Sequence, residues 1–173
     1  MKILVVVDMQ NDFVYDILGT PEARAIVPNV KARIESGEFE KIFFTKDTHD
    51  KNYMNTLEGQ KLPAPHCIKS TKGHNIIPEL NTDNSTIIEK PTFGSYDLIK
   101  HIKDLNDQQE EINEVEICGL CTDICVISNC LMIRAALPNT KVAVRANCCA
   151  GVTPEKHEAA LMVMESCQVD VIK

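Results

Sequence analysis

The stretch Glu116-Ile-Cys-Gly-Leu-Cys-Thr-Asp-Ile-Cys-Val126 joins the end of one predicted element to the start of another. The residues up to Cys118 end a short apolar run that is typical of a buried strand, and Gly119 breaks that run. Thr122 is a good helix N-cap, and apolar residues then recur at helical spacing, at Ile124, Ile127, Leu131 and Ala135. The pattern predicts a strand, a sharp turn and a helix, with Cys125 at about the third helical position.

Cys125 is a candidate nucleophile because of this predicted position. The first turn of a helix holds unpaired backbone N–H groups at the positive end of the helix dipole, which favours a thiolate over a thiol. The simpler interpretation is a small buried apolar residue, since free cysteine is usually that. This stretch alone leaves both interpretations open.

Outward from this stretch, strands and helices alternate along the chain. Aliphatic and β-branched runs predict strands at 3–7, 41–45, 85–89, 114–118, 141–144 and 169–172. Helices are predicted from Thr20-Pro21 to Gly37, over 95–105, from Thr122 to near Pro138, and from Thr153-Pro154 onward. Residues 50–84 are predicted to be a long loop and residues 107–113 a polar connection. This alternation predicts right-handed crossovers and a three-layer α/β/α fold with a doubly wound parallel sheet of about six strands.

Composition limits the kind of protein. A chain of 173 residues with 44% hydrophobic residues is long enough for one substantial core, so we expect one domain over 1–173. The formal charge of −7 argues against nucleic acid or an anionic membrane as the partner. Asp8 interrupts the apolar N-terminal run too early for a signal peptide, so we expect a soluble, cytoplasmic protein. No glycine-rich phosphate loop follows the first strand, so nucleotide binding has no support.

The chain has eight cysteines, which we expect to be reduced thiols in the absence of an export signal. Cys118 and Cys121 form a lone C-x-x-C pair, whereas a structural zinc site would need a second pair. A thiol redox pair stays open as an alternative, although its first cysteine would lie inside a strand.

Three predicted strand ends carry side chains that form a coherent chemical set. Asp8 follows the first strand, Lys90 follows the third, and Cys125 follows the fourth. If the first and fourth strands flank the switch point of the sheet, these side chains converge on one crevice. A carboxylate can then accept the thiol proton, and an ammonium can hold the thiolate. Taken singly, Asp8 is a turn residue and Lys90 a solvated lysine; together they indicate a catalytic site.

A second group follows the second strand. Asp47 and His49, with His66 in the long loop, can place one oxygen and two nitrogens around Zn²⁺ or a similar ion. Without further context, two surface histidines in a polar loop are an equally simple interpretation.

The chain resembles the isochorismatase-like cysteine hydrolases over nearly its whole length. The resemblance is carried by Val6-Val-Asp-Met-Gln-Asn-Asp-Phe13, by Lys90 followed shortly by Phe93, and by Gly119-Leu-Cys-Thr-Asp-Ile-Cys-Val126. It implies a catalytic triad of Asp8, Lys90 and Cys125. It also implies a cis peptide bond between Leu120 and Cys121, with an oxyanion hole formed by the N–H groups of Cys121 and Cys125. Family members usually have a small residue such as alanine where Cys121 stands.

Within that family, the Asp-x-His and His-Cys pattern resembles the nicotinamidases. The resemblance implies a divalent metal ion, zinc with manganese or iron as alternatives, on Asp47, His49 and His66. It also implies a fourth ligand from the loop, for which Glu58 is the first candidate and Asn55 the second. Nicotinamidases commonly have a tryptophan near the loop histidine; here Leu62-Pro-Ala-Pro65 stands in that place and the chain has no tryptophan. The substrate pocket is therefore expected to use Phe13, Phe93, Tyr96 and Leu120.

These observations predict a cysteine amidohydrolase acting on a small amide, with nicotinamide as the first candidate substrate. The alternatives are a related small-amide hydrolase, a metal-free isochorismatase, and a non-enzymatic thiol redox-sensing module. The sequence leaves open whether the protein forms a homo-oligomer.

Overall fold

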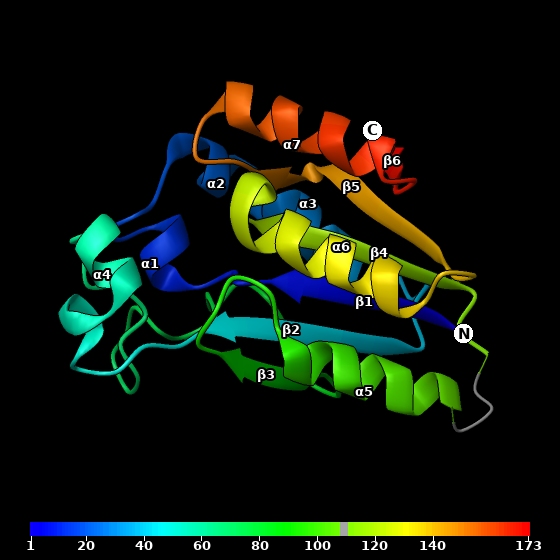
Figure 1. Ribbon diagram of the computed structural model, residues 1–173, viewed down its shortest axis with the longest axis horizontal. Helices are drawn as coiled ribbons and strands as arrows, with labels where there is room; N and C mark the ends of the chain where they lie inside the picture. The colour runs from blue at the N-terminus through cyan, green and yellow to red at the C-terminus, as the bar shows by residue number, and fades with distance from the viewer. Residues whose placement is uncertain (108–110) are drawn as a thin grey trace.

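The computed structural model describes residues 1–107 and 111–173. The middle of the polar connection predicted at 107–113 therefore lies outside the described residues. The described strands are β1 (Lys2–Val7), β2 (Lys41–Asp47), β3 (Thr86–Lys90), β4 (Glu114–Leu120), β5 (Lys141–Ala150) and β6 (Asp170–Ile172). They form one six-stranded sheet in the order β3-β2-β1-β4-β5-β6, and every neighbouring pair is parallel (Figure 1). The predicted doubly wound parallel sheet is confirmed, and its order reverses between β1 and β4.

Helices cover both faces of this sheet. They are α1 (Asn11–Val14), α2 (Pro21–Ala25), α3 (Val27–Ile34), α4 (Leu57–Lys61), α5 (Tyr96–Asp107), α6 (Ile127–Ala136) and α7 (Pro154–Ser166), with a 3₁₀ turn η1 (Tyr53–Asn55) and a π-helical turn η2 (Thr122–Val126). In Figure 1, α5 and α6 lie in front of the sheet and α3 lies behind it. The three-layer arrangement follows from right-handed crossovers that run in opposite directions from the central strand.

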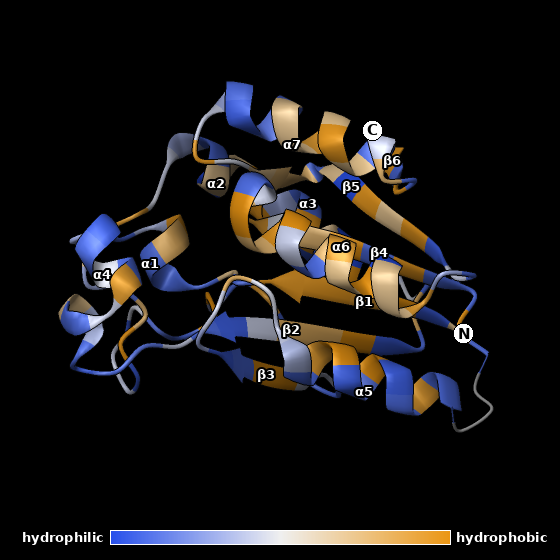
Figure 2. Ribbon diagram, viewed as in Figure 1, coloured by the Kyte–Doolittle hydropathy of each residue, from blue (hydrophilic) through white to orange (hydrophobic). Residues whose placement is uncertain are grey.

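The core is centred on β1, in which Ile3 to Val7 are fully buried. Figure 2 shows β1 as an almost continuous hydrophobic strand, as expected for a strand with helices on both faces. Because β1 and β4 are both central, the residues that follow them emerge at the middle of the sheet edge.

Two predicted elements differ from the structure. The helix predicted from Thr20 to Gly37 is divided at Ile26 into α2 and α3, because Pro28 lacks the N–H that would continue the first helix. Its start is as predicted: Thr20 is the N-cap, and its side chain accepts from the N–H of Ala23. The long loop over 50–84 contains η1 and α4, and Thr56 caps α4 by accepting from the N–H of Gly59.

Among the described residues, every helix is too short or too polar to cross a membrane.

Candidate active site and metal centre

The carboxylate of Asp8 and the ammonium of Lys90 meet at the carboxyl end of the sheet. Asp8 directly follows β1 in a left-handed backbone conformation, with φ of 49°. Lys90 is the last residue of β3 and reaches across β2, so that its Nζ lies 2.6 Å from Asp8 Oδ2. The hydroxyl of Thr45 in β2 donates to Asp8 Oδ1 at 2.7 Å. The carboxylate is therefore held from two sides and excluded from water.

Cys125 approaches this pair from the turn after β4. The peptide bond between Leu120 and Cys121 is cis. The Cys121 carbonyl then accepts from the N–H groups of Ile124 and Val126, at 3.0 and 3.1 Å, which closes the turn η2. The Cys125 sulfur lies 3.5 Å from Lys90 Nζ. The structure thus brings the acid, the amine and the thiol of the three strand ends into one cluster.

The local structure around Cys125 differs from the sequence prediction. Thr122 is not the N-cap; it is the first residue of η2, and its hydroxyl shares a 2.7 Å hydrogen bond with Nδ1 of His157 in α7. The N-cap position belongs to Cys121, whose side chain makes no capping bond. Cys125 lies in a π-helical turn rather than in the first turn of an α-helix, and such turns are frequent at functional sites.

The electrostatic environment of the thiol also differs from that expectation. Burial raises the pKa of Cys125 well above its ordinary value, and the negative charge of Asp8 raises it further, against the opposing effect of Lys90. The surroundings of the sulfur therefore oppose the thiolate that the helix start was expected to favour, because burial and the charge of Asp8 both disfavour a negative sulfur. An ionised base beside the sulfur is needed to remove its proton.

The groups next to the thiol are suited to that task. Burial raises the pKa of Asp8 above the usual value, against the charge of Lys90, so Asp8 is a better base than an exposed carboxylate. For Lys90, burial alone would lower the pKa, but the nearby charges of Asp8, Cys125 and Asp47 raise it well above normal. The lysine therefore remains an ammonium and holds its partners in place.

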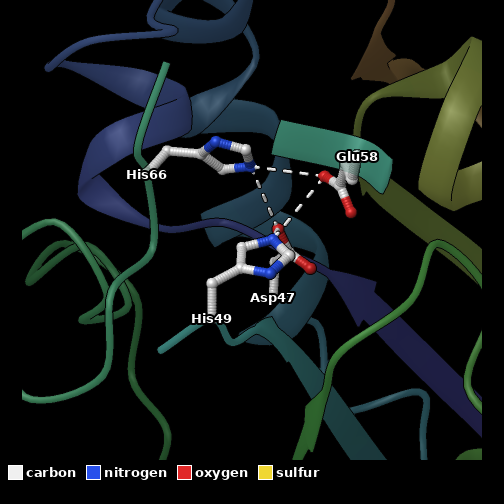
Figure 3. A group of neighbouring side chains, drawn as sticks. All are labelled: Asp47, His49, Glu58 and His66. Atoms are coloured by element: carbon white, nitrogen blue, oxygen red, sulfur yellow. Dashed lines mark hydrogen bonds and ion pairs between the residues drawn. The ribbon is translucent and has the colours of Figure 1, made fainter. Parts of the chain in front are cut away.

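A second cluster lies beside the first. It combines the last residue of β2, a residue of the segment after β2, one of α4 and one of the loop after α4. These four side chains place their ligand atoms within 4.8 Å of one another: Asp47, His49, Glu58 and His66 (Figure 3). Oδ2 of Asp47 lies 3.0 Å from His49 Nε2 and 3.3 Å from His66 Nε2, and Glu58 Oε1 lies 3.6 and 3.8 Å from those nitrogens.

The donor set of this cluster fits a divalent metal ion. Two imidazole nitrogens and two carboxylate oxygens are ligands that zinc, manganese and iron accept. Nδ1 of His66 lies 2.8 Å from the Ala64 carbonyl, so a proton on Nδ1 leaves Nε2 free to face the cluster. Glu58 is the loop carboxylate that reaches it, whereas Asn55, the second candidate, is exposed in η1.

The two clusters are joined through Asp47. Its Oδ1 lies 3.5 Å from Lys90 Nζ, while its Oδ2 faces the histidines. The side chain of Gln10 is fully buried, accepts from the Asp47 N–H at 2.7 Å and donates to the Asp47 carbonyl at 2.9 Å. Gln10 stands in the segment quoted for the family resemblance, but the sequence alone assigned it no role.

A pocket of about 230 Å³ opens onto both clusters. Of the four side chains predicted to form it, Phe13, Phe93 and Leu120 line it. The prediction for Tyr96 is wrong: this residue begins α5 and is 82% exposed, because α5 turns Leu98 and Ile102 toward the core instead. Further lining residues were not predicted, and they come mainly from the loops at this sheet edge: Leu18, Thr20, Ala23, Leu62, Ile124, Gly151 and Val152.

Comparisons with known proteins support a relationship over the whole chain. A family model described as the isochorismatase domain matches residues 2–173. The nicotinamidase of Schizosaccharomyces pombe is 26% identical, over 98% of this chain and 91% of that protein. The nicotinamidase/pyrazinamidase of Mycobacterium tuberculosis is 27% identical, over 99% of this chain and 98% of that protein. The crystal structure of Pyrococcus horikoshii pyrazinamidase in complex with zinc has a TM-score of 0.82 at 27% identity, covering 99% of this chain and 98% of that one.

Proposed function

Because this chain belongs to the isochorismatase family, we propose that it is a metal-containing cysteine amidohydrolase that converts nicotinamide and water to nicotinate and ammonia. The observation that carries the proposal is the position of Lys90, whose ammonium lies 2.6 Å from Asp8 and 3.5 Å from Cys125, and Cys125 lines the pocket. The relatives named nicotinamidase or pyrazinamidase support the choice of substrate.

The first half of the reaction forms a thioester. Asp8 accepts the thiol proton while the Cys125 sulfur attacks the carboxamide carbon, and the C=O electron pair moves to oxygen. The N–H groups of Cys121 and Cys125 hold this oxyanion; losing one such donor typically costs about 2.7–4 kcal/mol. When the C=O bond re-forms, the C–N bond breaks and Asp8 returns its proton to the nitrogen, so ammonia leaves.

The second half releases the acid. Asp8 accepts a proton from a water molecule whose oxygen attacks the thioester carbon, and the C–S bond then breaks. The proton on Asp8 returns to the sulfur, and the carboxylic acid gives its remaining proton to solvent and leaves as a carboxylate. Lys90 stays protonated throughout and compensates the negative charge that passes between Asp8 and Cys125.

Asp47, His49, Glu58 and His66 would hold the metal ion, and zinc is the first candidate, with manganese or iron as alternatives. When bound, a divalent ion supplies a positive centre that can ligate a ring nitrogen and organise water at this end of the pocket. The zinc complex of the Pyrococcus pyrazinamidase supports this assignment.

The size of the pocket supports a monocyclic substrate. An engineered apolar cavity of about 150 Å³ binds benzene, which has six heavy atoms. At the same space for each atom, the 230 Å³ pocket corresponds to about nine heavy atoms, the number in nicotinamide. Phe13 and Phe93 supply aromatic side chains to the pocket wall, and Leu62 supplies an aliphatic one in the stretch where nicotinamidases commonly have a tryptophan.

The alternative substrates and functions have weaker support. Isochorismate carries two carboxylates, whereas the described lining residues include Asp47 and Glu58 and no arginine or lysine. A redox-sensing Cys118–Cys121 pair is disfavoured because Cys118 is fully buried in β4 and burial raises its pKa well above normal. A related small-amide hydrolase remains the main alternative.

Steady-state ammonia release tests the proposal. Nicotinamide should be turned over faster than benzamide, which has the same ring size without the ring nitrogen, and faster than aliphatic amides. Cys125→Ala should abolish turnover, and elemental analysis should find about one divalent ion for each wild-type chain. Turnover by Cys125→Ala, or a preference for aliphatic amides with no response to nicotinamide, would contradict the proposal.

A further inference from the structure

Asn129 joins the Cys125 turn to the segment that follows β3. It lies in α6, four residues after Cys125, and its side chain is fully buried. Its Nδ2 donates to the carbonyl of Cys125 at 2.8 Å and to the carbonyl of Phe93 at 3.1 Å, and its Oδ1 accepts from the N–H of Ser95 at 2.9 Å. Two acceptors and one donor surround the amide, so only this orientation satisfies all three partners.

The segment 91–95 forms part of the pocket wall through Phe93. Phe93 lines the pocket and is 47% exposed, so the core does not hold its side chain. At the end of the segment, Ser95 accepts from the N–H of Leu98 at 3.1 Å and so begins α5. Asn129 therefore fixes the backbone on both sides of Gly94, between a residue of the pocket wall and the start of a helix.

We propose that Asn129 is a positioning residue that sets the separation between the Phe93 wall and the Cys125 sulfur, and thereby governs substrate affinity. Without the amide, the Phe93 carbonyl and the Ser95 N–H lose a buried partner, and the segment must move to reach another. The inference rests on the proposed function for its substrate and for Cys125 as the nucleophile.

Two substitutions separate the contacts of Asn129. In Asn129→Ser, the hydroxyl can still bond the carbonyl four residues earlier, that of Cys125, but it is too short to reach Phe93 or Ser95. We expect its KM for nicotinamide to rise about tenfold while kcat stays within about threefold of wild type. Asn129→Leu loses all three contacts, and we expect kcat/KM to fall about a hundredfold.

Two further variants distinguish positioning from a merely structural role. Arg134→Ala removes hydrogen bonds from the same helix to the Pro138 carbonyl and to Gln168, away from the pocket, and should keep the wild-type KM and kcat. In a Phe93→Ala background, Asn129→Ser should no longer raise KM, because the wall that it displaces has been removed.

The decisive measurement combines kinetics with alkylation of Cys125 by iodoacetamide, followed by peptide mass spectrometry with the exposed Cys167 as internal reference. In folded Asn129→Ser, we expect a raised KM and several-fold faster alkylation of Cys125 relative to Cys167, because the loosened wall exposes the sulfur.

A wild-type KM together with a wild-type alkylation rate would overturn the inference, as would a fall in kcat with KM unchanged. If Asn129→Leu does not fold, Asn129→Ser alone decides. If the wild-type protein releases no ammonia from nicotinamide, the proposed function fails, and the alkylation rates still test Asn129.

Discussion

Lys90 Nζ lies 2.6 Å from Asp8 Oδ2, and 1% and 0% of these two residues are exposed to solvent. The two residues come from strands that are not adjacent, since β2 lies between β1 and β3. A buried pair of this kind keeps a carboxylate charged where it would otherwise be neutral, which is the state in which it can accept the Cys125 proton.

Asp8→Asn should lower kcat by about 10² to 10⁴, because the amide has the shape of the carboxylate but cannot take the thiol proton. The rate of ammonia release from nicotinamide measures this. The matched control is Asp16→Asn, the same chemical change at an exposed position after α1, which should have the wild-type rate. Equal kcat values for Asp8→Asn and the control would exclude Asp8 as the base.

Lys90→Met should destabilise the protein by about 3–5 kcal/mol, because it leaves the Asp8 carboxylate buried without its counter-ion. Adding Asp8→Asn should recover part of this loss, since the double variant contains neither buried charge of the pair. Urea unfolding of both single variants and the double variant gives the coupling energy. Strictly additive losses would mean that the pair does not act as a unit.

His66→Ala should remove most of the bound metal, and Glu58→Gln should retain part of it, because Glu58 is the most exposed of the four residues. Elemental analysis after gel filtration measures the metal content. Adding the metal ion to metal-free wild-type protein should raise its thermal midpoint. At a metal concentration of a hundred times Kd, the stabilisation should be about 2.7 kcal/mol. His101→Ala changes an exposed histidine on α5, and loss of metal there would argue against the assigned ligands.

Glu116 in β4 should make the stability of the fold sensitive to acid. Burial alone would raise its pKa, but hydrogen bonds from Arg145 and Arg33, at 2.6–2.9 Å, lower it below the ordinary 4.5. A lowered folded-state pKa means that the stabilisation is complete above pH 4.5 and is lost as pH falls through the folded-state value.

Glu116→Gln should therefore cost about 3–5 kcal/mol at neutral pH, because two arginines lose a buried counter-ion. Its deficit relative to wild type should shrink as pH falls below the ordinary glutamate pKa. Urea unfolding at several pH values measures both effects. The control is Glu35→Gln, which makes the same chemical change at an exposed glutamate. It should change the free energy of unfolding by less than about 0.5 kcal/mol at any pH. A constant deficit for Glu116→Gln down to acid pH would contradict the linkage.

Gly119→Ala should prevent normal folding or cost more than about 4 kcal/mol. Gly119 has φ of 115°, and a Cβ there would lie 2.1 Å from the backbone carbonyl oxygen of Val7 in the neighbouring strand. Gly37→Ala is the control: its φ is 71°, but no atom lies within 4 Å, so only the backbone conformation costs energy, about 1–2 kcal/mol. Thermal unfolding of the two variants should separate them clearly, and similar midpoints would contradict the steric argument.

The amino-acid sequence alone was sufficient for the order of strands and helices. Hydrophobic periodicity and residues such as Thr20-Pro21 act within a few positions of the chain, so the alternation of elements, and from it the parallel sheet, can be read locally. The same alternation put Asp8, Lys90 and Cys125 near one edge of the sheet. Pro28, which divides the helix predicted from Thr20 to Gly37, is also a local signal. The helical spacing of apolar residues on both sides of it nevertheless led to the prediction of one continuous helix.

The tertiary structure alone decided which side chains meet at that edge and in what electrostatic state. The direction in which the Cys125 pKa moves depends on burial and on Asp8 from another strand, and neither can be read from the turn that carries the cysteine. The exposure of Tyr96, the approach of Glu58 rather than Asn55, and the contacts of Asn129 with Phe93 and Ser95 likewise depend on how distant elements pack. Periodicity is a property of neighbouring residues, whereas desolvation and contact across strands arise only when the whole chain has folded.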